Sequence, residues 1–168
     1  MVRFGIHDTD QVIVSRVRGD MALSPDGRTL AFVGFGKNGA RLWTHDIGSL
    51  ETRELPGTDA SFGVAWSPDG KALAFPSYGQ IKKVNVAGGA AESIAAGVSG
   101  SVSGALAGGG RAIQWGPDGT ILFSDSRGFW RAAATGSSAV TQLTSSSPVT
   151  QLMRSGAELD SIRSALQR

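Results

Sequence analysis

Three aspartates recur at equivalent points of the chain: Asp26, Asp69 and Asp118. Carboxylates gathered on one face could attract a hard cation, which prefers several oxygen ligands. Each aspartate, however, lies in a Pro-Asp-Gly string, and this is ordinary turn chemistry, because proline presets φ and glycine tolerates positive φ. We therefore expect structural turns and no metal site. The residues that form these turns are Pro25, Asp26, Gly27, Pro68, Asp69, Gly70, Pro117, Asp118 and Gly119.

The residues available for catalysis are sparse. The chain has two histidines, His7 and His45, and no cysteine. A catalytic triad needs a nucleophile, a base and an orienting group brought together, and no such set is evident beside His45. The nearest string to a G-x-S-x-G elbow, "GVSGS" at 97–101, lacks the final glycine. We expect no catalytic residues and no cofactor, and we interpret His45 as an ordinary surface residue.

The elements that carry these residues are repeated. "ALSPDGRTLAF" (22–32), "AWSPDGKALAF" (65–75) and "QWGPDGTILF" (114–123) each predict a strand, a tight turn and a second strand. Two further strands follow each copy, and the aspartates are 43 and then 49 residues apart. Four strands in a period of about 40 to 50 residues are typical of propeller blades. We predict an all-β fold: a partial β-propeller of about three four-stranded antiparallel blades.

The flanking segments complete the predicted organisation. Ser155 and Glu158 have capping-box spacing, and an apolar stripe at helical spacing follows them, which predicts a short C-terminal helix. A β-branched stretch at 11–17 predicts an additional strand near the N-terminus. The predicted divisions are an N-terminal strand region (1–20), blade 1 (21–59), blade 2 (60–97), a Gly-rich connector with blade 3 (98–144), and a tail with the helix (145–168).

The composition limits the classes of partner. The chain has 168 residues, a net charge of +2 and no run of basic residues, so we expect no binding to nucleic acid. No apolar stretch is long enough for a membrane span, so we expect no membrane insertion and a cytoplasmic location, or an extracytoplasmic one in a longer receptor. Trp66 and Trp115 occupy equivalent positions, as do Trp43 and Trp130, and we interpret these aromatic residues as packing between blades.

The repeated unit, a hydrophobic pair followed by S-P-D-G and then L-A-F, resembles the TolB-like β-propeller repeat. The order of the copies looks closest to the propeller regions of bacterial serine/threonine protein kinases. The similarity extends over about Met21 to Thr144. It implies a WD40-like propeller that serves as an interaction region of a bacterial protein. The kinase motifs themselves are missing: there is no Gly-rich phosphate loop, no H-R-D and no D-F-G.

Three blades are fewer than the four to eight of closed propellers. An open stack leaves an apolar face at each end, which soluble monomers rarely expose. Two alternatives follow: the chain is a fragment of a longer propeller, or it forms a homo-oligomer that completes the ring.

The function expected from these features is a non-enzymatic recognition or sensor module. Loops on a rigid scaffold carry function most often. We predict that a protein or peptide partner binds the face opposite the Pro-Asp-Gly turns, at Lys37, Asn38, Tyr78 and Arg127. The alternative is a regulatory propeller of a larger enzyme, a serine/threonine kinase or a peptidase, whose catalytic domain lies outside this sequence.

Overall fold

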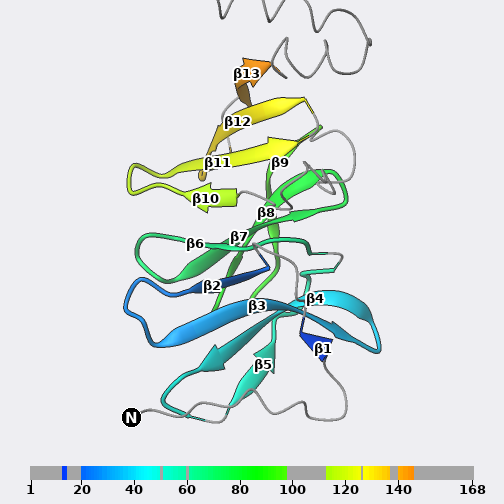
Figure 1. Cartoon of the computed structure of the whole chain (residues 1–168), viewed down its shortest axis with the longest axis vertical. Coiled ribbons are helices and arrows are strands. Elements are labelled where there is room, and N and C mark those ends of the chain that lie inside the picture. Colours follow the sequence, from blue (N-terminus) through cyan, green and yellow to red (C-terminus); the bar gives the residue numbers. More distant parts are fainter. Residues whose placement is uncertain are drawn as a thin grey trace, which may run out of the picture.

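Three antiparallel β-sheets lie one above the other along the long axis of the molecule (Figure 1). The computed structural model describes residues 13–14, 20–49, 51–59, 61–97, 113–125, 127–136 and 140–145. We call the sheets blades 1, 2 and 3 in chain order. Their strands are β2 (Met21–Leu23), β3 (Thr29–Gly36), β4 (Gly39–Asp46) and β5 (Thr52–Glu54); β6 (Ala65–Trp66), β7 (Ala72–Ser77), β8 (Gln80–Asn85) and β9 (Glu92–Ala96); and β10 (Ile113–Trp115), β11 (Thr120–Asp125), β12 (Gly128–Ala133) and β13 (Thr141–Ser145).

Blade 1 contains one additional strand. β1 (Ile13–Val14) pairs with β3 at Gly34 and Phe35, on the same edge of β3 that β2 pairs with at Leu30 to Phe32. β1 and β2 therefore lie in line and share one strand position. Part of the segment expected to form an N-terminal strand does so, and it joins the sheet of the first blade.

The Pro-Asp-Gly turns form through the same hydrogen bonds in blades 1 and 2. The Ser67 hydroxyl donates to Asp69 Oδ1 at 2.7 Å, and the amide of Lys71 donates to that same oxygen at 3.1 Å. Gly70 adopts φ of +70°, the left-handed region in which a side chain would be strained. Ser24 and Asp26 repeat this arrangement in blade 1. The serine and the aspartate thus hold the turn between the first and second strands of both blades.

The third turn replaces the serine by Gly116, and the aspartate compensates. The amide and the hydroxyl of Thr120 both donate to the Asp118 carboxylate, at 3.0 and 2.9 Å. A Cβ added at Gly116 would lie 2.8 Å from Asp118 Oδ1. The carboxylate therefore occupies the space that a side chain at 116 would need.

Alternating side chains give each blade two apolar faces. We call the side toward the preceding blade the front face, and the side toward the following blade the back face. Strand residues alternate between the two, so the hydrophobic core is two layers between sheets. The first layer joins the back of blade 1 to the front of blade 2: Ala31, Val33, Leu42, Leu55, Val64, Trp66, Leu73, Phe75 and Val84. The second joins blade 2 to blade 3: Ala65, Ala74, Ile81, Ile94, Ala95, Ile113, Ile121, Phe123 and Ala132.

The tryptophans pack between blades, as predicted, at three of the four positions. Trp66 is buried in the first layer, and its indole N–H donates to the carbonyl of Ala22 in blade 1 at 2.9 Å. Trp115 and Trp130 pack against the second layer. Trp43 pairs with Phe32 across β3 and β4, on the front face of blade 1.

The predicted C-terminal helix (155–166) and most of the Gly-rich connector (98–112) lie outside the described residues. Within the ranges described above, no helix is long and apolar enough to cross a membrane.

Candidate recognition faces

The turns between second and third strands define one face of the stack, which we call the loop face. An antiparallel blade places these turns and the connectors to the next blade at the same end. Lys37 and Asn38 are exposed in the β3–β4 turn, and Tyr78 forms the β7–β8 turn with Gly79. Tyr78 is 78% exposed, and its φ of +47° is the one positive value at a non-glycine residue in the described chain.

Arg127 lies in the corresponding turn of blade 3, and its partly exposed guanidinium contacts other residues of the chain. Its Nε and Nη2 donate to Asp125 Oδ2 at 3.0 and 2.8 Å, and Nη2 also reaches the Gly97 carbonyl at 3.1 Å. The group lies 4.6 Å from the ring centre of Trp130. The Trp130 indole in turn donates to Asp125 Oδ1 at 2.8 Å. These contacts give Arg127 a structural role, which its position in the sequence does not reveal.

Burial acts to raise the pKa of the Asp125 carboxyl, whose side chain has no exposed surface. The hydrogen bonds from Arg127 and Trp130 outweigh burial, and the net effect is a pKa below the ordinary value. The carboxylate is therefore held in its charged form as an acceptor for both side chains.

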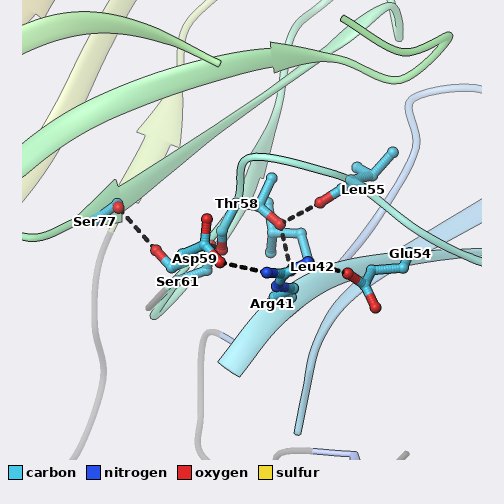
Figure 2. Close-up of polar contacts among 8 residues, drawn as sticks. All are labelled: Arg41, Leu42, Glu54, Leu55, Thr58, Asp59, Ser61 and Ser77. Atoms are coloured by element: carbon cyan, nitrogen blue, oxygen red, sulfur yellow. Dashed lines mark hydrogen bonds and ion pairs between the residues drawn. The ribbon is translucent and has the colours of Figure 1, made fainter. Parts of the chain in front are cut away.

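A polar network supports the loop face at the junction of blades 1 and 2 (Figure 2). Arg41 lies between two carboxylates: Nη1 pairs with Glu54, and Nη2 donates to Asp59 at 2.7 Å. The hydrogen bond to Glu54 is the main reason that the pKa of Arg41 is raised. Arg41 thus bridges the two carboxylates, and no spacing pattern in the sequence indicates this cluster, because its members are spread over 41–59.

Hydroxyl groups next to this cluster form hydrogen bonds that hold the connector from blade 1 to blade 2. Thr58 Oγ1 accepts from the Leu42 amide at 2.9 Å and donates to the Leu55 carbonyl at 2.6 Å. Ser61 donates to the Thr58 carbonyl, and Ser77 donates to the Asp59 carbonyl (Figure 2). All three hydroxyl side chains are buried. The loop face between blades 1 and 2 therefore rests on a fixed backbone.

The opposite face carries the three Pro-Asp-Gly turns, at the left of Figure 1. Hydrogen bonds lower the pKa of all three aspartates, mainly from the serine hydroxyls at Asp26 and Asp69 and from the Thr120 amide at Asp118. In the described part of the chain, no group of three or more histidine or acidic side chains is placed to hold a metal ion.

A groove of about 540 Å³ lies on this second face, between blades 2 and 3. Its charged lining is largely paired: Lys83 Nζ lies 3.1 Å from Glu92 and donates to the Ala134 carbonyl at 3.3 Å. Asp69 is engaged in its own turn. Because Trp115 of blade 3 completes a lining that otherwise comes from blade 2, no single repeat of the sequence indicates the groove.

His45 is not the surface residue that we expected. It is 3% exposed, and its Nδ1 lies 2.9 Å from the Thr52 hydroxyl. The prediction was wrong because His45 lies within β4 and pairs with Leu30 on the front face of blade 1, where Phe32 is buried as well.

Comparison with known proteins supports the architecture. No family model and no curated protein matches the chain. Among solved structures, a TolB from Agrobacterium tumefaciens aligns with a TM-score of 0.61 and 23% identity over 80% of this chain and 48% of its own. TolB from Acinetobacter baumannii aligns with a TM-score of 0.56 and 18% identity over 78% and 33%. An oligogalacturonate lyase in complex with manganese has a TM-score of 0.54 and 20% identity over 71% and 36%.

This chain thus spans half or less of the length of these neighbours. Identities below 25% carry information on the fold, and the neighbours include both TolB proteins and an enzyme. The three stacked sheets have Pro-Asp-Gly turns, and two TolB structures are among the neighbours. This chain therefore has a TolB-like β-propeller fold.

Proposed function

We propose that this chain is a non-enzymatic recognition module that binds a protein or peptide partner on its loop face. The observation that carries the proposal is Tyr78, an aromatic side chain that is 78% exposed at the tip of a rigid two-residue turn. Its positive φ is an unfavourable conformation for tyrosine, which a glycine or asparagine would adopt at lower cost. Exposed aromatic residues on a fixed backbone are the type that most often dominates binding energy.

The surroundings of Tyr78 fit this role. Lys37 and Asn38 add exposed polar groups on the same face, and the connector held by Thr58 keeps the two turns in a fixed relation. Pre-organised loops lose little conformational entropy on binding. The mechanism is shape and polar complementarity, with no bond chemistry.

The proposal is tested by selecting peptides from a random library on phage against the immobilised full chain. The selected peptides are then measured against variants. We expect Tyr78→Ala to weaken binding about tenfold or more, Tyr78→Phe to retain most of it, and Lys37→Ala to weaken it less. Asp118→Asn, on the opposite face, is the matched control. Peptides that bind Tyr78→Ala and Lys37→Ala as well as the unaltered chain would refute a loop-face site.

A second candidate function is a regulatory propeller within a larger enzyme. It is favoured by one observation: the chain aligns with 36% of an oligogalacturonate lyase and 21% of a puromycin hydrolase, so propellers of this fold occur as parts of longer enzymes. Reading the genomic frame on either side of the sequence tests this candidate. An adjoining kinase or hydrolase frame would support it, and flanking frames without one would contradict it.

A further inference from the structure

The exposed apolar side chains are concentrated on the two outer faces of the stack. Seven large hydrophobic residues are exposed among the described residues. Two of them, Phe35 and Tyr78, lie at or near loop-face turns. The other five lie on the front face of blade 1 and the back face of blade 3: Met21, Leu23, Leu122, Phe129 and Leu143, between 43% and 53% exposed.

The back-face residues of blade 3 occupy positions that are buried in blade 2. Leu122 in β11 is equivalent to Ala74 in β7, since each pairs with the same position of the third strand. Phe129 is equivalent to Ile81, because each directly precedes a β-bulge between the third and fourth strands. Leu143 is the additional residue of this bulge in blade 3. Its counterpart Ile94 is 4% exposed, and Ala74 and Ile81 are 0% exposed, because blade 3 covers them. Blade 3 therefore presents the surface on which another blade packs.

The front face of blade 1 presents the other half of such a contact. Met21 and Leu23 occupy the positions of Val64 and Trp66, which are 5% and 8% exposed against blade 1. The corresponding Ile113 in blade 3 is also buried, against blade 2. Along β2 the front face of blade 1 therefore repeats one side of the junctions inside the chain, whereas Phe32 and His45 on the same face are already buried, at 1% and 3% exposed.

A polar contact recurs at these junctions as well. Arg53, on the last strand of blade 1, donates to the Val86 carbonyl of blade 2. Lys83 of blade 2 donates to the Ala134 carbonyl of blade 3, and Val86 and Ala134 follow the third strands at equivalent positions. Arg131 takes the place of Lys83 in blade 3 and is exposed. A following blade would place the equivalent carbonyl, that of Ile47 in blade 1, within its reach.

We propose that the back face of blade 3 docks on the front face of blade 1 of a second copy of this chain, and that two such contacts close a six-bladed ring. The contact continues the interfaces that join blades 1, 2 and 3. This chain aligns with 48% of the length of the TolB from Agrobacterium tumefaciens, so two copies together match about the length of one such propeller. A two-fold axis along the ring makes both contacts identical, which is how closed dimers form. The inference is independent of what the loop face binds.

The experiment is the solution mass of the full chain across a concentration series, by light scattering on a sizing column. We expect twice the chain mass of 17.3 kDa. Phe129→Glu and Leu23→Glu should each weaken dimerisation about tenfold or more, because each places a charge in both contacts of the ring. Tyr78→Glu is the matched control, an exposed aromatic residue away from either outer face. Circular dichroism verifies that each variant keeps its β-sheet, and Leu122→Gln is the milder substitute.

Mixing the two variants tests the orientation of the contact. A ring formed from one Phe129→Glu copy and one Leu23→Glu copy has one intact contact and one that carries both substitutions. Partial recovery of the dimer on mixing supports docking of back face on front face. A mass that stays at 17.3 kDa would overturn the proposal and assign the outer faces to further blades of a longer polypeptide. A dimer that survives both variants, or no recovery on mixing, would also overturn it.

Discussion

The two junctions between blades are alike in their apolar layers and in one cationic side chain that reaches a carbonyl of the next blade, and they differ in their hydroxyl groups. Leu42 and Ile81 occupy the same position in the back faces of blades 1 and 2, and both are 0% exposed. The first junction adds buried hydroxyl groups, of which Thr58 is the centre. At the second junction, the long charged side chains of Lys83 and Arg127 reach carbonyl groups of the neighbouring blade.

The difference follows from what repeats. Apolar positions recur in every blade because each blade must bury two faces, whereas the hydroxyl network belongs to a connector that occurs once. The shared apolar layer is therefore the basis of stacking, and the polar contacts adapt each junction to its own connector. Substitutions at apolar, hydroxyl, carboxylate and turn positions test this division, and their expected effects decrease in that order.

Truncation of the shared apolar position should affect both junctions to a similar degree. We expect Leu42→Ala and Ile81→Ala each to lower the free energy of unfolding by about 2 to 5 kcal/mol, since each leaves a cavity in a buried layer. Phe129→Ala, at the exposed equivalent position, should cost less than about 0.5 kcal/mol in dilute protein. Urea unfolding followed by tryptophan fluorescence measures all three. A large cost for one junction alone would break the similarity between them.

Removal of the Thr58 hydroxyl should weaken the first junction specifically. Thr58→Val preserves shape but leaves the Leu42 amide and the Leu55 carbonyl without this partner, so we expect a loss of about 2 kcal/mol. Thr141→Val, on the exposed last strand, is the control and should change stability by less than about 0.5 kcal/mol. An equal effect of the two substitutions in urea unfolding would argue against a specific role of the connector.

Asp125→Asn should weaken the second junction, by about 1 to 2 kcal/mol. The amide cannot accept from Arg127 and Trp130 as the carboxylate does, and the partial exposure of Arg127 (44%) limits the loss. Because the pKa of Asp125 is below its ordinary value of 3.8, this stabilisation is present above that pH and is lost as the pH falls through the lower folded value. Unfolding experiments at pH 7 and at decreasing pH should show the difference between the two proteins disappear. A difference that persists in acid would contradict the assignment to the carboxylate.

The smallest effect is expected in the turns, which lie outside the junctions. Ser67→Ala removes the main hydrogen bond that lowers the pKa of Asp69, so that pKa should rise toward its ordinary value. The pKa of Asp118, whose turn has glycine in place of serine, should not change in the same variant. NMR titration of the side-chain carboxyls measures both. An unchanged Asp69 would show that the Lys71 amide alone controls it.

The repeat explains why the architecture could be predicted. Pro-Asp-Gly with strand residues on either side is a local signal, and it occurs three times in phase, so the number of sheets and the order of strands follow without knowledge of distant contacts. The exposed positions of Lys37, Asn38 and Tyr78 follow from the turns in the same way. Their role in binding remains a prediction.

Other features could not be predicted because they depend on which residues meet. Arg127 has the sequence context of a free loop cation, but its partners Asp125, Trp130 and Gly97 come from two blades. His45 was misjudged because its burial depends on the packing of the front face of blade 1, where Phe32 is also buried. The Arg41 cluster has no spacing pattern at all.

Local sequence specifies the blade: the turn, the four strands and the alternation of apolar residues are properties of short segments, governed by φ preferences and by burial on two sides. How the blades join, and which faces remain open, depends on the packing of whole blades against one another. The same apolar position is buried at Ile81 and half-exposed at Phe129, although local sequence rules treat the two alike. The physical reason is that burial depends on the neighbour, and blade 2 has a described blade on its back face whereas blade 3 does not.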